Sequence, residues 1–344
     1  MKPWYILLAI LAFGTLVLIH ELGHFLCARA RGVEVKEFAI GMGPRICGWT
    51  SKKYGTKYSL RALPIGGYVS MLGEDEESDR NDAFGNRPVW KRILIVIAGP
   101  VMNLLLGFLA MLVLVTSSGA LYGTEIVYPD NGKVQISDAA GLDNGDVILK
   151  IGGIGVHTRN ELVYEILRQG TEAIDVTVRR GGEKLVVEDV IFPTIEESGV
   201  VFGGVDFYGN EESVTFGNVI KHTFFRSIST VKMIVDSFVD LVTGRYGMES
   251  MSGPVGITQT IGESAANGFS SFLYIFVVIT INLGVFNLFP IPALDGGRLL
   301  FLVMEAIIRK PINKNVEGII HFVGLLLMLG LIAVVTFNDI VKLF

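Results

Sequence analysis

The stretch at residues 15–27, TLVLIHELGHFLC, places two histidines and a glutamate inside an apolar segment. A metal-binding or charged side chain at membrane depth is costly, so its presence there indicates a functional site. His20 and His24 are four residues apart, which puts both imidazoles on one face of a helix, one turn apart. Both rings can therefore reach one zinc ion, while Glu21 projects beside them toward a water molecule.

A third protein ligand has to come from elsewhere in the chain. Catalytic zinc needs three protein ligands with water in the fourth position, and nothing downstream in the same segment continues the motif. Residues 282–298, NLGVFNLFPIPALDGGR, contain a candidate in Asp295. Pro290 and Pro292 cannot sustain a helix, so we predict a broken helix here. A carboxylate on such a break is tolerable in a membrane only against a metal, a partner or water.

Composition indicates a membrane protein with a soluble part. Half of the 344 residues are hydrophobic, only 18% are charged, and the mean hydropathy is +0.51. Four apolar runs, at 3–19, 93–115, 272–289 and 319–337, are each long enough to cross most or all of a bilayer core. The net charge of -5 and the absence of a basic tract argue against a nucleic-acid partner. Cys27 and Cys47 make no disulfide framework, and packing is the expected role of Cys27 rather than metal binding.

The distribution of lysine and arginine predicts the orientation of the four spans. Residues 26–92 hold twelve of these side chains and residues 298–314 hold four, while each terminus outside the apolar runs holds one. Positive residues stay in the cytoplasm, so both termini and the region 116–271 are expected outside it. Both halves of the metal motif then reach the cytoplasmic leaflet.

The region between the second and third spans has the pattern of a small soluble domain. Strand-like runs such as AIDVTVRR and KLVVEDVIF alternate with glycine-rich turns. The stretch SDAAGLDNGDVILKIGG, at 137–153, resembles bacterial PDZ domains, which capture extended peptides at a sheet edge. Peptide recognition and steric filtering of substrates are both open as its role. Residues 216–242 carry the apolar stripe of an amphipathic helix, which lies on the outer membrane surface or packs on this domain.

HELGH combined with NLFPIPALDG resembles the site-2 protease family of intramembrane zinc metalloproteases. The single PDZ-like insertion is similar to the RseP-like branch, which contains bacterial regulators of sigma-factor signalling. LRALPIGGYVSMLGE at 60–74, IAGPVMNLLLG at 97–107 and GPVGI at 253–257 also fit this branch. The resemblance covers nearly the whole chain. Residues 121–205 have room for one PDZ domain, whereas well-known Gram-negative members carry two.

This resemblance implies the roles of five site residues. His20, His24 and Asp295 would hold Zn²⁺, and Glu21 would be the general base that activates water. Asn287 would steady the substrate carbonyl or the developing oxyanion, with helix capping as its alternative role.

A predicted hairpin after the first span supplies the candidate substrate-binding residues Gly66, Gly67 and Tyr68. A transmembrane helix has its carbonyls already hydrogen-bonded, so it must unwind before hydrolysis. An exposed strand near the zinc could capture the unwound segment by strand addition. In GPVMN, the Gly-Pro pair would kink the second span, and Asn103 either bonds near the site or ties two helices together.

The predicted fold class is a polytopic α-helical membrane protein of about four transmembrane helices, with a cytoplasmic-side β-hairpin and an inserted extracytoplasmic α+β PDZ domain. Its expected parts are transmembrane helix 1 with HELGH (1–26), a cytoplasmic-side loop and membrane-associated hairpin (27–91), transmembrane helix 2 (92–118), the PDZ domain (119–208), amphipathic membrane-surface helices (209–270), transmembrane helix 3 with the broken segment (271–300), a cytoplasmic loop (301–317) and transmembrane helix 4 (318–344).

The expected function is zinc-dependent endopeptidase activity inside the bilayer of a bacterial inner membrane. The substrates would be single-span membrane proteins, such as anti-sigma factors or remnant signal peptides, after an upstream site-1-type protease has trimmed their outer part. The alternative is a catalytically idle scaffold that binds peptides through its PDZ domain. Glu21 argues against the scaffold, because a structural zinc site is closed by four protein ligands and needs no base.

Overall fold

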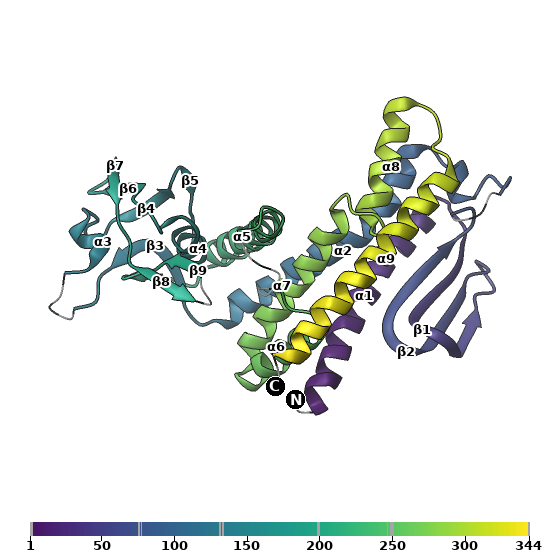
Figure 1. The fold of residues 1–344 in the computed structure, drawn as a ribbon, viewed down its shortest axis with the longest axis horizontal. Helices are drawn as coiled ribbons and strands as arrows, with labels where there is room; N and C mark the ends of the chain where they lie inside the picture. Colours follow the sequence, from purple (N-terminus) through teal and green to yellow (C-terminus); the bar gives the residue numbers. More distant parts are fainter. Residues whose placement is uncertain are drawn as a thin grey trace. The chain divides into compact units, whose positions relative to one another are not determined.

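The computed structural model describes residues 3–342 except 75, 77, 131, 133, 198–199, 246 and 248–250. It divides into two compact units, each of which is described by itself (Figure 1). The first unit comprises Met1–Ala110 and Gly247–Phe344, and the second comprises Met111–Tyr246.

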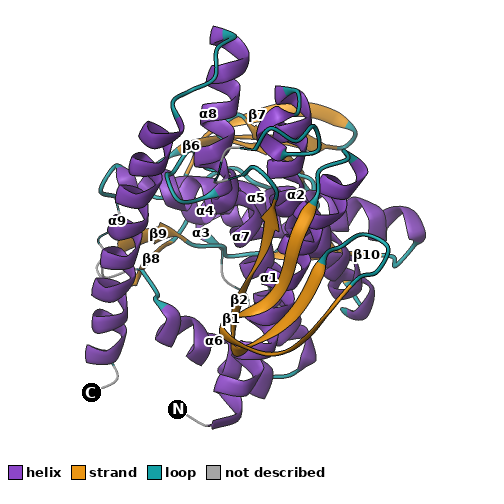
Figure 2. Cartoon of the chain, turned by 90° about the vertical axis from the view of Figure 1, so that its right-hand side faces the viewer, coloured by secondary structure: helices purple, strands orange, loops and turns teal. Residues whose placement is uncertain are grey.

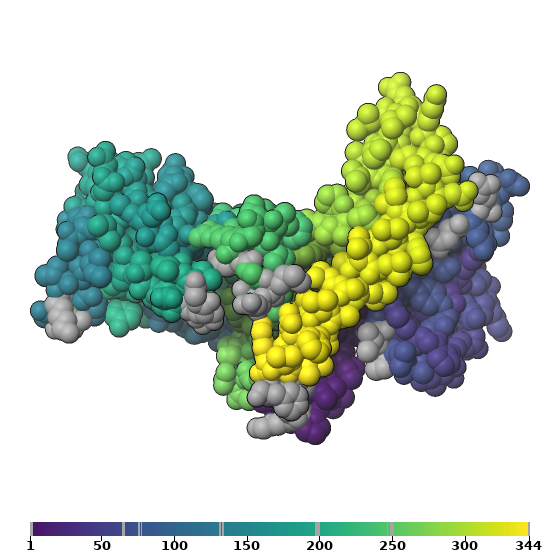
Figure 3. Space-filling model, viewed as in Figure 1, coloured from purple at the N-terminus to yellow at the C-terminus, as the bar shows by residue number. Residues whose placement is uncertain are grey.

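Four helices are long and apolar enough to cross a membrane. They are α1 (Pro3–Ala30), α2 (Val89–Ser117), α7 (Phe269–Leu288) and α9 (Lys314–Val341). The four apolar runs predicted from hydropathy thus lie largely in helices, and α1, α2 and α9 extend beyond their runs. Only 11% of the apolar window of α9 is buried, and Figure 3 shows this helix, in yellow, on the surface. A helix with so many exposed apolar side chains suits a lipid environment.

Two long strands follow α1, namely β1 (Val35–Thr50) and β2 (Lys57–Met71), and they pair antiparallel as they curve together (Figure 2). Residues 35–40 of β1 pair with residues 67–71 on one side, and residues 37–40 also pair with residues 57–60 on the other. Among the described residues, the end of β2 therefore has a strand partner on one side only. A short 3₁₀ turn, Phe84–Asn86, then leads into α2.

The chain breaks after α7 and resumes as a separate helix, α8 (Asp295–Ile308). The cytoplasmic loop predicted for 301–317 is wrong in part, because residues 301–308 are helical and α9 begins at Lys314. The amphipathic sequence of α8 hides this helix from a search for apolar runs. Arg92 of α2 pairs with Glu305 at 2.9 Å, and Arg298 pairs with Glu74, so ion pairs tie α8 to its neighbours.

Helix α6 (Pro254–Ala266) begins at a cap that another helix supplies. Asp339 of α9 is 6% exposed, and its carboxylate accepts hydrogen bonds from the backbone N–H of Gly253 at 3.1 Å and of Gly256 at 2.8 Å. A Cβ atom on Gly253 would lie 2.8 Å from the same carboxylate. This contact gives a physical reason for the glycines of GPVGI, since the first N–H groups of a helix need an acceptor.

Asp339→Ala is expected to destabilise the first unit by about 1–3 kcal/mol, because it removes a charged acceptor from the buried N–H of Gly253 and the half-buried N–H of Gly256. Thermal unfolding of the purified chain in detergent measures this change. Asp339→Asn, which keeps one oxygen acceptor, should fall between wild type and Asp339→Ala. An alanine variant as stable as wild type would show that the cap contributes nothing.

The second unit is built on a mainly antiparallel sheet with the strand order β10-β3-β4-β6-β7 and with β5 beside β4. A separate pair joins β8 to β9. The strands are β3 (Leu121–Val127), β4 (Val147–Ile151), β5 (Ile154–Gly155), β6 (Ile174–Arg180), β7 (Glu183–Val190), β8 (Thr194–Glu197), β9 (Val200–Gly203) and β10 (Tyr208–Glu212). The helices α3 (Ile136–Ala139) and α4 (Arg159–Gln169) complete it. Ile148, Leu162 and Val178 are fully buried in its core.

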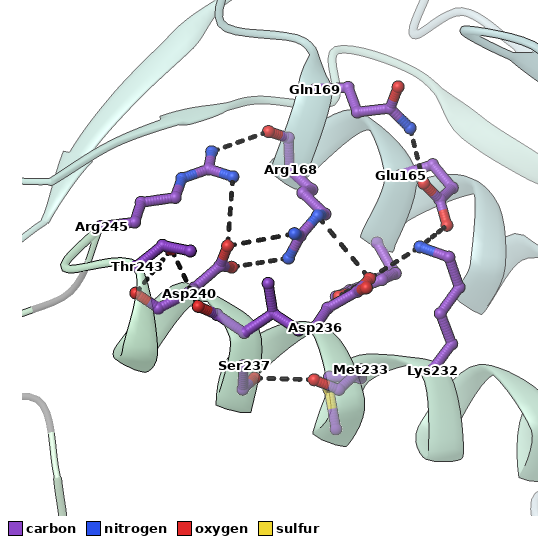
Figure 4. A network of polar contacts seen from close by, with 12 residues as sticks. Glu165, Arg168, Gln169, Lys232, Met233, Asp236, Ser237, Asp240, Thr243 and Arg245 are labelled. Carbon is purple, nitrogen blue, oxygen red and sulfur yellow. Dashed lines mark hydrogen bonds and ion pairs between the residues drawn. The ribbon is translucent and has the colours of Figure 1, made fainter.

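Helix α5 (Phe216–Val242) packs on this sheet domain through its charged face. Arg168 of α4 bonds Asp240 at 2.6 Å, and Lys232 of α5 pairs with Glu165 at 2.8 Å (Figure 4). Several apolar residues of α5 remain exposed, among them Phe216, Ile220, Phe224, Ile228 and Val242, whereas Val219 and Ile234 are buried. The predicted amphipathic helix is thus present, and much of its apolar stripe is exposed within this unit.

The pH dependence of stability in this unit is expected to involve His222 of α5. Burial lowers the pKa of His222 despite its 3.0 Å contact with Glu212, so the folded chain holds a neutral ring that donates to the carboxylate. The unfolded chain takes up a proton near the ordinary histidine pKa of about 6.5, so stability should fall as the pH drops through that value.

Thermal unfolding at about pH 7.5 and about pH 5.5 tests this, with His222→Gln as the comparison. Glutamine keeps a donor near the position of Nε2 but does not titrate, so the variant should lose less stability on acidification. Equal losses in both proteins would contradict the assignment.

Candidate metal and catalytic centre

Three side chains converge on one point in the first unit. His20 Nε2 lies 3.0 Å from Asp295 Oδ2, His24 Nε2 lies 3.3 Å from the same oxygen, and the two Nε2 atoms are 3.2 Å apart. Ligands of a tetrahedral zinc ion with bonds of about 2.0–2.1 Å lie about 3.3 Å from one another. The spacing of the three atoms therefore fits this ion, and both histidines are buried.

Contacts behind the histidines direct their Nε2 atoms to that point. His24 Nδ1 lies 2.8 Å from the carbonyl oxygen of Ile95, so the ring donates from Nδ1 and leaves the lone pair on Nε2. His20 Nδ1 lies 3.2 Å from the amide of Asn103, which is fully buried and has no bonding partner for its Oδ1 among the described residues. Turning the amide brings Oδ1 to His20 Nδ1, which satisfies both groups and frees Nε2 for a metal.

Asp295 Oδ2 is itself buried with no hydrogen-bond partner among the described residues, although two imidazole nitrogens face it. One cation bound by this oxygen and by the lone pairs of the two Nε2 atoms would satisfy all three atoms. The donor set of two imidazoles and one carboxylate is one that zinc accepts. The residues present therefore fit the metal.

A close approach of α2 to α1 fixes the position of His24. A Cβ atom on Gly99 would lie 2.3 Å from His24 Nε2, and a Cβ atom on Gly23 would lie 2.3 Å from the carbonyl oxygen of Ala98. Only glycine at these two positions lets the helices approach closely enough for the ring to reach Ile95. Pro100 follows directly and removes one helical N–H donor of α2.

Asp295 is the first residue of α8, directly after the break at residues 289–294. In NLFPIPALDG the structure has α7 ending at Leu288 and α8 beginning at Asp295. The positive end of the α8 dipole lies at this N-terminus and favours the carboxylate.

A cavity of about 500 Å³ opens beside the three converging side chains. Glu21 and Tyr68 line it together with His20, His24 and Asp295. Glu21 therefore faces the same space as the candidate ligands and does not complete a closed four-ligand site. This is the arrangement expected of a catalytic metal centre rather than a structural one.

The predicted hairpin residues lie at the end of β2 beside this centre. A Cβ atom on Gly67 would lie 3.4 Å from Glu21 Cγ, which shows how closely the strand passes the glutamate. Gly66 has a φ of 82°, a conformation that favours glycine, and Tyr68 accepts a hydrogen bond from Arg61.

Asn287 is not brought to the cavity wall. It is half-buried in the last turn of α7, and the described residues that line the cavity do not include it. The wall contains another residue whose importance we did not predict, His321 of α9. His321 has no ligand-type residue three or four positions after it, and we expected it to be structural.

Comparison with known proteins shows the family of this chain. Residues 8–331 match the sequence model of peptidase family M50. A protein of Clostridium acetobutylicum named as a zinc metalloprotease is 37% identical over 344 residues, which cover 99% of this chain and 98% of that protein. The regulator of sigma-W protease RasP of Bacillus subtilis is 31% identical over 425 aligned positions, covering 97% and 98% of the two chains.

The zinc metalloprotease RasP of Shouchella clausii is also 31% identical, with 98% and 99% coverage. Family and relatives imply a Zn²⁺ cofactor, and together with four apolar helices they indicate a multi-pass membrane protein. The chain belongs to peptidase family M50 and is a zinc metalloprotease of the site-2 type.

Proposed function

We propose that this protease hydrolyses peptide bonds within the transmembrane segments of single-span membrane proteins. The observation that carries the proposal is the convergence of His20, His24 and Asp295 at 3.0–3.3 Å beside an open cavity in a unit whose helices suit a bilayer. The idle-scaffold alternative is disfavoured, because that function needs neither an open cavity nor a glutamate in its wall.

In this proposal His20, His24 and Asp295 hold Zn²⁺, which when bound supplies Lewis-acid polarisation of water and of the scissile carbonyl. Glu21 lines the same cavity and takes the proton from the attacking water, then returns it to the leaving amine. Asn103 and the carbonyl of Ile95 hold the two imidazoles in the tautomer that exposes Nε2.

Substrate capture is assigned to the end of β2, where Gly66, Gly67 and Tyr68 lie. This segment has a strand partner on one side only among the described residues, and it passes beside Glu21. An unwound substrate segment added to the free side would satisfy its own backbone groups and lie along the cavity. Asn287 keeps a proposed role with the substrate carbonyl, although helix capping fits its position at the end of α7 equally well.

The sheet domain of the second unit is proposed to be a single PDZ domain that filters substrates by size. Its AGL-x-x-GD turn precedes β4, and α4 follows β5 as in that resemblance. The charged face of α5 forms ion pairs with α4 and also contacts Glu212 of β10. These contacts limit the access of a peptide to α4 and β10. We favour the filter over peptide docking for this reason, and we propose that the exposed stripe of α5 lies on the outer membrane surface.

The topology and partners follow as part of the same proposal. Lysine and arginine counts support termini and a PDZ domain outside the cytoplasm of a bacterial cell, with the active centre toward the cytoplasmic leaflet. The relative named regulator of sigma-W protease suggests an anti-sigma factor as one substrate class. An upstream site-1-type protease would then trim that substrate first, and remnant signal peptides are a second class.

The proposal is tested by incubating the full chain in detergent with a tagged single-span substrate whose ectodomain has been trimmed. We expect one cut, mapped by mass spectrometry inside the transmembrane segment, that stops with a zinc chelator and returns with added Zn²⁺. Inactivity toward a panel of such substrates, with zinc tightly bound, would favour the scaffold. Equal cleavage of trimmed and full-length substrates would remove the size filter alone.

A further inference from the structure

The turn that delivers Asp295 has a strained backbone. Ala293 lies two residues before Asp295 and has a φ of 76°, a left-handed conformation that residues with a Cβ atom rarely adopt. The turn is also compact, since a Cβ atom on Gly296 would lie 1.9 Å from the carbonyl oxygen of Phe289. A conformation of this kind persists only where the surrounding structure fixes it.

Helix α9 holds this turn in place through one hydrogen bond and one close contact. The backbone N–H of Ala293 donates to His321 Nδ1 at 2.9 Å. Almost one turn further along α9, a Cβ atom on Gly324 would lie 2.4 Å from Pro292 Cβ. His321 and Gly324 therefore contact the Pro292–Ala293 segment from the same face of α9. The ring centroid of Phe301 lies 5.7 Å from that of the His321 imidazole.

The hydrogen bond from Ala293 also defines the tautomer of the His321 imidazole. A backbone N–H can only donate, so Nδ1 of His321 has no proton and the neutral ring carries it on Nε2. Nε2 is buried, and no described residue bonds to it. The contact that His321 makes with the site therefore runs through Nδ1 and the backbone of Ala293.

We propose that His321 is a positioning residue for the metal centre, whose Nδ1 holds Ala293 in its left-handed conformation and thereby sets where α8 begins and where the Asp295 carboxylate lies. This role rests on the proposed metal set of His20, His24 and Asp295. Relaxation of Ala293 would rotate the peptides between it and the first residue of α8. The carboxylate would then leave the point at which the two Nε2 atoms converge.

Two substitutions test the two ring nitrogens of His321 separately. His321→Asn places an oxygen acceptor near the position of Nδ1 and lacks the Nε2 donor, whereas His321→Gln places an amide nitrogen near Nε2 and lacks the Nδ1 acceptor. The full chain in detergent is stripped of metal and titrated with Co²⁺, whose visible absorption reports tetrahedral coordination. His157→Gln in the second unit, a half-exposed histidine, is the matched control.

We expect wild type, His321→Asn and His157→Gln to share one Co²⁺ spectrum and similar affinities. His321→Gln should bind Co²⁺ about 10–100-fold more weakly, the usual effect of losing an outer contact to a metal ligand. This readout needs no substrate, so a protein that binds Co²⁺ as expected but cleaves nothing would refute the proposed proteolysis and leave the positioning role standing.

Equal Co²⁺ affinity in the Gln variant and wild type would overturn the role of Nδ1, as would an Asn variant as weak as the Gln variant. Absence of tetrahedral absorption in the wild type would overturn the metal set and this role together. If His321→Gln fails to fold, the Co²⁺ affinity of Gly324→Ala is measured instead, because its methyl group would push α9 away from Pro292. An unchanged Co²⁺ affinity in that variant would also refute the proposal.

Discussion

Glu21→Gln is expected to lower the rate of substrate cleavage by about 10²–10⁴-fold while Zn²⁺ stays bound, since glutamine cannot take a proton from water. Glu21 lines the cavity but is not one of the three groups that converge on the metal point, so the ligand set remains intact. Cleavage of a trimmed single-span substrate and the zinc content of the purified protein are measured side by side.

The matched control for this prediction is Glu263→Gln, the same substitution at an exposed position of α6 in the same unit. Its cleavage rate should equal that of wild type. A Glu21→Gln protein that cleaves normally would exclude Glu21 as the base. A variant that has lost both zinc and activity would show instead that Glu21 supports the metal, and a different proton acceptor would be required.

Gly99→Ala is expected to weaken zinc binding by about 10–100-fold although it removes no ligand. The added methyl group would lie 2.3 Å from His24 Nε2, so the ring must move away. Because Nδ1 of the same ring is held by the carbonyl of Ile95, any movement breaks that contact or shifts Nε2 from the metal point. Alanine favours a helix over glycine by about 1 kcal/mol, so loss of α2 is not an alternative cause.

Competition with a chromophoric chelator measures the zinc affinity of this variant. Gly14→Ala is the control, because no atom lies within 4 Å of the Cβ position at Gly14 and its affinity should be unchanged. Wild-type affinity in Gly99→Ala would mean that the two helices can separate without cost to the site. In that case the close approach at Gly99 would not be what positions His24.

The residues that converge at the centre could be found from sequence because their chemistry is local or unusual. The i, i+4 spacing of His20 and His24 puts them on one face of any helix, and a carboxylate beside two prolines in an apolar run indicates a functional site by its cost in a membrane. Their convergence in the structure agrees with that reasoning, while zinc binding by these residues stays a prediction. The spans were equally predictable, since a bilayer imposes length and hydropathy on each of them.

The supporting contacts could not be predicted, because they depend on tertiary distances. Gly99 matters through a neighbour 75 positions away, and His321 through a backbone N–H 28 positions away. The sequence leaves two roles open for Asn103, and only the fold places its amide against His20. Helix α8 was missed past residue 300 for a different reason, because its 14 residues are too few for a span and Arg298 and Glu305 interrupt its apolar sequence.

The two halves of the metal centre lie at distant points of the sequence, with HELGH in α1 and Asp295 at the start of α8. A nascent chain therefore carries the two histidines through most of its synthesis without the carboxylate that completes the set. During this time the partly inserted protein lacks a ligand set that could hold a catalytic metal tightly. On the proposed metal set, proteolysis is therefore expected to begin only after α8 has been synthesised.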